Sequence, residues 1–261
     1  MAAILLDIEG VLHVSWRETP GARAAVQRLR ADGHRLRFVT NNTTRPRREL
    51  ALELRRLGIE LEEDELQTTP LAAVRALKGQ RVLAMTMPRI IDDLKGIELV
   101  GESADAVLIG GADETAVTNQ VFSYMNLARG FAELEAGASL YCLHRNRWWQ
   151  TARGPLLDAG AFVAGLEYAA QTEATLLGKP SLVYFEAALN ALDADPERTW
   201  MVGDDLEADI AGAQAFGMKA ILVRTGKFRD AELEGSATVP DVVIDSVADL
   251  PEWLEDHEDW H

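Results

Sequence analysis

The chain of 261 residues is long enough for one large domain or two smaller ones, and its 48% hydrophobic and 26% charged residues are typical of a globular protein. The formal net charge of −16 repels nucleic acids and anionic membranes, so we expect neither as a partner, and any anion site must be locally basic or hold a metal ion. No apolar run reaches the ~20 residues that cross a bilayer, and the first run, 2–6, is too short for a signal peptide. The single cysteine, Cys142, excludes an internal disulfide and predicts a cytoplasmic location.

Strand-like and helix-like segments alternate in the first part of the chain. The apolar pattern predicts strands at 3–7 and 36–40 and helices at 19–33, 45–58 and 71–79. For the first helix we expect Thr19 at the N-cap, Pro20 at the first helical position and Gly33 at the C-terminal end. This βαβα order predicts a parallel sheet with helices on its faces.

The same alternation returns near the C-terminus. It predicts helices at 181–194, 205–217 and 247–255 and strands at 199–204, 219–226 and 241–244. The intervening block has a helical stretch at 118–134 and four strand-like runs of its own, at 81–86, 97–101, 106–111 and 139–144. We therefore expect a discontinuous α/β domain formed by 1–70 and 177–261, with a second α/β domain, 71–176, inserted into it.

Polar side chains follow three predicted strands at the point where each strand ends. These are Asp7, Thr40 and Asp204, and Lys179 stands just before a predicted helix. Ligands of parallel α/β sheets bind at the carboxyl ends of the strands, so the four side chains could meet in one crevice. Taken singly, such residues more often form turns and helix caps, and Asp205 fits the N-cap of the next helix.

Together these residues fit phosphoryl transfer. The Asp7 and Asp204 carboxylates are hard oxygen ligands suited to Mg²⁺, and Thr40 can donate a hydrogen bond to a phosphate oxygen. Lys179 can offset phosphate charge, and an aspartate such as Asp7 can act as a nucleophile that forms an aspartyl-phosphate. Catalysis of phosphoryl transfer depends mainly on positioning the reactants and on stabilising the charge of the transferring phosphoryl group.

The sequence resembles a known superfamily at four places, in this order: DIEGVL at 7–12, FVTNNT at 38–43, GKP at 178–180 and GDDLEADI at 203–210. These stretches look like the four motifs of the haloacid dehalogenase superfamily. The long interval between Thr40 and Lys179 is similar to that of the branch with a large cap between the second and third motifs. The resemblance implies a Rossmann-like, doubly wound parallel-sheet core with an inserted α/β cap of the C2 type.

The resemblance also implies a role for each matching residue. Asp7 would be the catalytic nucleophile and a Mg²⁺ ligand, and Asp204 would be the second carboxylate ligand. Glu9 would offer its backbone carbonyl to Mg²⁺ and its side chain for acid/base catalysis. Asp209 would support the metal without binding it directly, and Asp205 would either do the same or cap the following helix. The residues that would hold the transferring phosphoryl group are Thr40, Asn41 and Lys179.

Glu9 departs from the superfamily's pattern, because its phosphatases normally carry Asp at this position. That residue protonates the leaving oxygen and then activates water against the aspartyl-phosphate. A stem one methylene longer leaves three outcomes open: a working phosphatase with shifted geometry, a slow one, or a protein that binds Mg²⁺ and a phosphorylated ligand with little turnover. A misplacement of about 1 Å can cost ~10²-fold in rate.

Within the inserted block, the segment 142–155 combines basic and aromatic side chains, which are His144, Arg145, Arg147, Trp148, Trp149 and Arg153. It could draw in an anionic substrate and cover its apolar part, which makes His144, Arg145 and Arg147 candidate substrate contacts. Equally, the two tryptophans could pack inside the domain while the arginines stay in solvent.

The sequence therefore predicts a Mg²⁺-dependent phosphatase for a small phosphorylated molecule, which could be a monoester, a pyrophosphate or a phosphoamide. The alternative is a weakly active or inactive protein that binds Mg²⁺ and a phosphorylated ligand. A dehalogenase is disfavoured, because Thr40 and Asp204 preserve phosphate and metal ligands that it does not need. A phosphomutase is disfavoured, because 12–35 leaves room for only one helix between the first two motifs. Capped relatives often dimerise through the cap, so we expect a homodimer.

Overall fold

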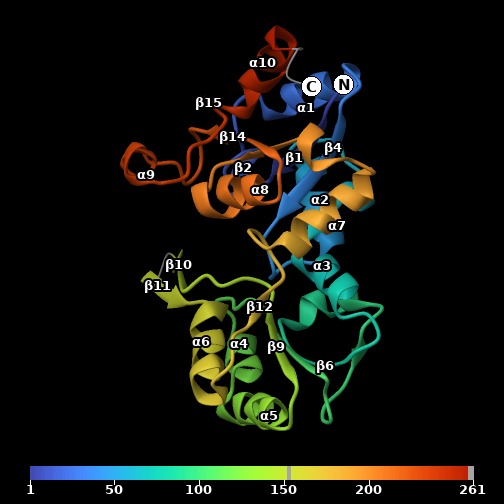
Figure 1. Cartoon of the computed structure of the whole chain (residues 1–261), viewed down its shortest axis with the longest axis vertical. Helices are drawn as coiled ribbons and strands as arrows, with labels where there is room; N and C mark the ends of the chain where they lie inside the picture. The colour runs from blue at the N-terminus through green and yellow to red at the C-terminus, as the bar shows by residue number, and fades with distance from the viewer. Residues whose placement is uncertain (152–153, 258–261) are drawn as a thin grey trace. The chain divides into compact units, whose positions relative to one another are not determined.

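The computed structural model describes residues 1–151 and 154–257, except for the side chains of 149–151 and 232. Its contacts divide the chain into two compact units (Figure 1). The first unit consists of Met1–Thr40, Arg48–Gln67 and Lys179–His261, and the second of Asn41–Arg47 and Thr68–Gly178. The segment Asn41–Arg47 therefore groups with the second unit, which the sequence did not indicate. The domain limits at 70/71 and 176/177 stay a prediction.

The first unit is built on a six-stranded sheet in the order β15-β14-β13-β1-β4-β5. Its strands are β1 (Ala3–Asp7), β4 (Arg35–Thr40), β5 (Leu66–Thr68), β13 (Thr199–Gly203), β14 (Lys219–Val223) and β15 (Val242–Ile244). β1 pairs in parallel with β4 on one side and with β13 on the other, and β14 pairs in parallel with both β13 and β15. In chain order, β4 and β5 first extend the sheet on one side of β1, and β13, β14 and β15 then extend it on the other side. The strand order therefore reverses between β1 and β13. The predicted doubly wound α/β fold is confirmed, and such a reversal is where ligands of these folds bind.

The helices of this unit are α1 (Ala22–Ala31), α2 (Arg47–Arg56), α7 (Leu182–Leu192), α8 (Gly212–Ala215), α9 (Asp230–Gly235) and α10 (Leu250–Asp256). Shorter 3₁₀ turns lie at Glu63–Glu65, Pro196–Arg198 and Val247–Asp249, and a π-helical turn, Leu206–Ala211, leads into α8. A small hairpin of β2 (His13–Val14) and β3 (Arg17–Glu18) follows β1. Ser181 caps α7, since its hydroxyl accepts a hydrogen bond from the Tyr184 N–H.

The predicted start of α1 at Thr19 is wrong. The Thr19 carbonyl accepts a hydrogen bond from the Ala22 N–H at 2.9 Å, and Gly21 between them has a φ of +83° and a ψ of −5°. With Pro20 before this glycine, the four residues form a type II turn, and α1 begins only at Ala22. A Thr-Pro pair resembles an N-cap and first helical residue, but the left-handed glycine delays the helix.

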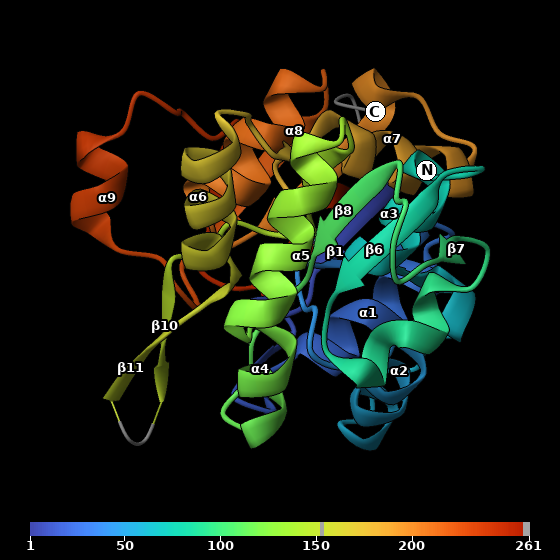
Figure 2. The same ribbon diagram turned by 90° about the horizontal axis from the view of Figure 1, so that it is seen from below.

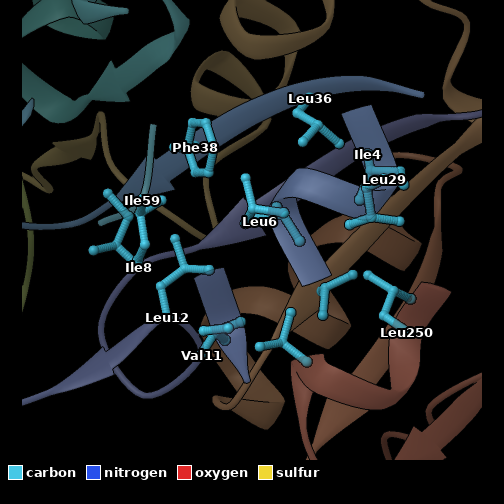
Figure 3. Packing of buried hydrophobic residues seen from close by; sticks show 14 of the residues in the cluster. Ile4, Leu6, Ile8, Val11, Leu12, Leu29, Leu36, Phe38, Ile59 and Leu250 are labelled. Atoms are coloured by element: carbon cyan, nitrogen blue, oxygen red, sulfur yellow. The ribbon is translucent and has the colours of Figure 1, made fainter. Parts of the chain in front are cut away.

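The core of the first unit lies where β1, β4 and α1 meet. Ile4 and Leu6 of β1 pack with Leu36 and Phe38 of β4 and with Leu29 of α1 (Figure 3). β1 is buried along its whole length, which is typical of a parallel strand covered on both faces. This packing holds the last residue of β1 at the carboxyl edge of the sheet.

The second unit has a parallel five-stranded sheet of its own, in the order β12-β9-β8-β6-β7. Its strands are β6 (Arg81–Met85), β7 (Glu98–Leu99), β8 (Ala106–Ile109), β9 (Ser139–Cys142) and β12 (Thr175–Leu176). Its helices are α3 (Thr69–Ala76), α4 (Ala116–Val121), α5 (Tyr124–Glu135) and α6 (Ala159–Ala170), with a 3₁₀ stretch at Pro88–Leu94. The helices α5 and α6 pack against each other and against β8, as Figure 2 shows, and an antiparallel hairpin of β10 (Trp148–Thr151) and β11 (Gly154–Leu157) precedes α6.

The helical stretch predicted at 118–134 is two helices. The chain breaks after α4, where Ser123 caps α5 by accepting a hydrogen bond from the Asn126 N–H. The preceding Phe122 stacks on Phe162 of α6 with ring centroids 4.1 Å apart, so tertiary packing accompanies the break. In the part of the chain that the structure describes, no helix is both long and apolar enough to cross a membrane.

Candidate active site

Three buried carboxylates meet at the carboxyl edge of the first unit's sheet. Asp7 ends β1, Asp204 directly follows β13, and Asp209 lies in the π-helical turn after it. Each offers an oxygen atom, and the three oxygens lie within 4.8 Å of one another. The predicted convergence of Asp7 and Asp204 is therefore present, at the point where the strand order reverses.

Lys179 is the cation of this cluster. Its Nζ donates to Asp7 Oδ1 at 2.5 Å and to Asp209 Oδ1 at 2.6 Å. Burial alone would lower the pKa of Lys179, but the carboxylates of Asp209 and Asp7 outweigh it and raise that pKa, so the side chain is an ammonium. Lys179 precedes α7 and reaches residues that lie 172 and 30 positions away in the chain.

The carboxylates hold more negative charge than one lysine can balance. Burial, together with the neighbouring carboxylates, outweighs the effect of Lys179 and raises the pKa of Asp7, of Asp204 and of Asp209 to about 6 each. Excess buried charge and an all-oxygen donor set are what a hard divalent cation requires. The residues present therefore fit Mg²⁺. Asp7 and Asp204 are the carboxylates best suited to hold it, because both oxygens of Asp209 accept hydrogen bonds, one from Lys179 Nζ and the other from the Asp205 N–H.

Asp205 caps the turn that follows, which bears out the interpretation as an N-cap. Its Oδ1 accepts hydrogen bonds from the Glu207 and Ala208 N–H groups, and its Oδ2 accepts one from Lys227 Nζ at 2.9 Å. Burial opposes ionisation of Asp205, but Lys227 and the two amides outweigh it and hold the pKa of this carboxyl below its usual value.

Thr40 is buried at the end of β4, and its backbone is fixed by a residue that sequence reasoning missed. The Tyr184 hydroxyl accepts a hydrogen bond from the Thr40 N–H at 2.8 Å and lies 2.9 Å from the carbonyl oxygens of Thr40 and Gln67. Tyr184 is fully buried on α7. The only sequence signal was a tyrosine in an apolar helix. Asn41, the other predicted phosphate ligand from this loop, belongs to the second unit and packs beside Gly178.

Glu9 differs from Asp7 in its surroundings, because its side chain is exposed and that of Asp7 is buried. The backbone of Glu9 bridges to His13, whose ring is buried and stacks on Trp16. Burial lowers the pKa of His13, and the Glu9 carboxylate opposes this effect. Glu9 is thus a solvent-accessible carboxylate two positions after a buried one.

The described basic residues of segment 142–155, His144, Arg145 and Arg147, have different surroundings. His144 is buried, its Nε2 lies 3.6 Å from Asp158 Oδ1, and burial lowers its pKa. Arg145 makes two hydrogen bonds to the Glu167 carboxylate, at 2.9 and 2.8 Å. Arg147 and Trp148 are exposed at the start of the β10–β11 hairpin. The Trp149 side chain and the whole of Arg153 lie outside the described residues.

Comparison with known proteins identifies the family of this chain. Residues 4–99 match a family model described as haloacid dehalogenase-like hydrolase, and 176–250 match one described as HAD-hydrolase-like. The chain is 38% identical over 248 residues to haloacid dehalogenase-like hydrolase domain-containing protein 2 of Bos taurus, which covers 94% of this chain and 93% of that protein. The chain belongs to the haloacid dehalogenase-like hydrolase family. The predicted family and its hydrolase class are thereby confirmed.

Several similar family members are named as phosphatases. The chain is 34% identical to the phospholysine phosphohistidine inorganic pyrophosphate phosphatase of Xenopus laevis, over 94% of this chain and 92% of that protein. Its fold matches the p-nitrophenyl phosphatase of Archaeoglobus fulgidus with a TM-score of 0.88 at 27% identity, over 97% of this chain and 99% of the other. It also matches the glycerol phosphate phosphatase of Mycobacterium tuberculosis, solved in complex with magnesium, with a TM-score of 0.83 at 26% identity, over 95% and 76% of the two chains.

Proposed function

We propose that this family member is a Mg²⁺-dependent phosphatase that hydrolyses a small phosphorylated molecule through an aspartyl-phosphate on Asp7. The observation that carries the proposal is the buried cluster of Asp7, Asp204 and Asp209 around Lys179. A buried nucleophile beside a cation and a metal-binding carboxylate pair is the arrangement that phosphoryl transfer needs. The phosphatase names of several relatives support it.

In the proposed reaction a carboxylate oxygen of Asp7 attacks phosphorus, and the bond to the leaving oxygen breaks. Glu9 gives its proton to that oxygen, while Lys179, Thr40 and Asn41 stabilise the charge on the phosphoryl oxygens. Water then attacks phosphorus and loses a proton to Glu9, which releases phosphate and restores the Asp7 carboxylate. Mg²⁺, held by Asp7, Asp204 and the carbonyl of residue 9, would neutralise phosphate charge.

Glu9 also motivates the alternative, a protein that binds Mg²⁺ and a phosphorylated ligand with little turnover. Its carboxyl group is the acid that the reaction needs, on a longer stem than aspartate has. Its exposure supports the catalytic role, because an accessible carboxyl group can exchange protons with solvent between the two steps.

We propose that residues 71–176, which belong to the second unit, form the cap that selects the substrate. Among His144, Arg145 and Arg147, we favour Arg147 as the anion contact, because His144 is buried and Arg145 is paired with Glu167.

A homodimer through the second unit is also proposed, since Tyr124 and Tyr168 are each 82% exposed on its helices. Light scattering of Tyr168→Glu against the wild type tests it, because a charge at that surface should give monomers. The cytoplasmic location stays a prediction.

The test of the proposed function is release of inorganic phosphate from p-nitrophenyl phosphate, with and without Mg²⁺. We expect activity in the wild type with Mg²⁺ and a loss of at least about 10³-fold in Asp7→Asn, because no other group can take the phosphoryl group. Asp245→Asn, at an exposed carboxylate of the same unit, is the control and should retain full activity. Phosphate release that survives in Asp7→Asn would refute the assignment of the nucleophile.

A further inference from the structure

The Asp204 carboxylate is enclosed by backbone from two separate loops. Gly10 follows β1 and Gly226 follows β14, and both have left-handed backbone, with φ of +89° and +64°. A Cβ atom built on either glycine would overlap Asp204 Oδ2. One on Gly226 would also overlap the Cα of Gly10. The two glycines therefore form a cradle around the Asp204 carboxylate, and neither position has room for a Cβ atom.

Two hydrogen bonds hold this cradle together. The Thr225 hydroxyl donates to the Gly10 carbonyl at 2.5 Å and joins the two loops. The Lys227 backbone N–H donates to Asp204 Oδ2 at 2.7 Å. One carboxylate oxygen of Asp204 is thus held by a backbone amide.

We propose that Thr225, Gly226 and Lys227 form a backbone clamp that orients the Asp204 carboxylate for the proposed Mg²⁺ site. This inference rests on the proposed phosphatase function, since it assigns positioning residues for its metal. Hydrogen bonds that orient metal-binding carboxylates raise metal affinity, and their loss typically costs about 10–100-fold. Gly226 is the central residue. Any side chain there would displace either the Asp204 carboxylate or the loop whose Lys227 N–H donates to that carboxylate.

The competing explanation is that Gly226 serves only as a turn residue with left-handed backbone. Gly217 separates the two explanations, because it has a φ of +88° in the same unit. An added Cβ there would lie 3.8 Å from Pro196 Cβ, an ordinary contact. Gly217→Ala therefore imposes the same backbone strain without touching Asp204, and it is the matched control for Gly226→Ala.

The experiment titrates Mg²⁺ into each full-length variant by calorimetry, without substrate, and records circular dichroism and thermal unfolding in chelator. We expect Gly226→Ala to bind Mg²⁺ about 10–100-fold more weakly than the wild type and Gly217→Ala to stay within about twofold. Gly226→Ala should lose at least as much thermal stability as Gly217→Ala, because it adds an overlap with Asp204 and Gly10 to the strain of a left-handed alanine. Thr225→Val, which keeps the glycine but loses the bond to Gly10, provides a second measurement if Gly226→Ala does not fold, and it should weaken Mg²⁺ binding by about 3–10-fold.

Mg²⁺ affinity in Gly226→Ala equal to that of the wild type, or equally weakened in Gly217→Ala, would overturn the clamp. If only Thr225→Val folds, wild-type affinity in that variant would overturn it. A wild type that binds no Mg²⁺ would instead refute the proposed metal site, so failure of the clamp and failure of the proposed function give different results.

Discussion

The Lys179 ammonium lies 2.6 Å from a carboxylate oxygen of Asp209, and only 3% and 1% of these two side chains are exposed. The same ammonium also bonds to Asp7. One buried cation is therefore shared by two buried carboxylates. Removing one partner of a buried pair costs more than the pair contributes, because the remaining charge stays buried without compensation.

Lys179→Met should therefore lower the free energy of unfolding of the metal-free protein by about 3–5 kcal/mol, measured by urea denaturation. Lys227→Met is the control, because Lys227 pairs with Asp205 through side chains that are 68% and 27% exposed. That exposed pair should cost about 1 kcal/mol or less. Equal losses in the two variants would contradict the view that burial makes the Lys179 pairs important.

Mg²⁺ binding should depend on pH. Burial raises the pKa of Asp7 and of Asp204 to about 6, so in the metal-free protein both carboxyl groups take up protons as the pH falls below that value. Mg²⁺ must displace those protons, and its affinity should drop between pH 7 and pH 5 and level off above pH 7. Calorimetric titrations across this range check the prediction, and a constant affinity would contradict the raised pKa values.

Substitutions at Glu9 should separate acid/base catalysis from metal binding. Glu9→Gln should lower kcat for phosphate release by about 10²–10⁴-fold, because the amide neither gives nor takes the proton. Its Mg²⁺ affinity should match that of the wild type, since the proposed metal contact at this position is a backbone carbonyl. Glu9→Asp is the conservative comparison and should retain more activity than Glu9→Gln. A large gain of turnover in Glu9→Asp would instead favour the weakly active alternative.

Tyr184→Phe should destabilise the first unit without changing its shape. The substitution removes the hydroxyl that accepts from the Thr40 N–H, and the loss of this buried hydrogen bond should cost about 1 kcal/mol. Tyr168→Phe removes an exposed hydroxyl but keeps the ring at the proposed dimer surface, so it should leave the free energy of unfolding unchanged and serves as control. Urea denaturation of both variants provides the comparison, and equal stability of Tyr184→Phe and the wild type would show that the hydroxyl bonds contribute nothing.

The sequence allowed prediction of the residues that follow strands, because strand ends in a parallel sheet share one edge. Asp7 and Asp204 were found in this way. Tyr184 was not, since its bond to Thr40 spans 144 residues and depends on how α7 docks on β4. The backbone N–H of Lys227 was not predicted either, because every residue except proline has this donor and the sequence does not show which one faces Asp204. The local signal for a helix start at Thr19 was also wrong, because the left-handed backbone of Gly21 delays the start of α1 to Ala22.

The central claim is that Asp7 carries the phosphoryl group during turnover. The most direct measurement is borohydride trapping with Mg²⁺ and p-nitrophenyl phosphate, followed by peptide mass spectrometry, because an acyl phosphate is reduced to an alcohol and a free carboxylate is not. Asp7 should be converted to homoserine during turnover and should stay unmodified without substrate. Turnover with an unmodified Asp7, or with the reduction at another carboxylate, would contradict it.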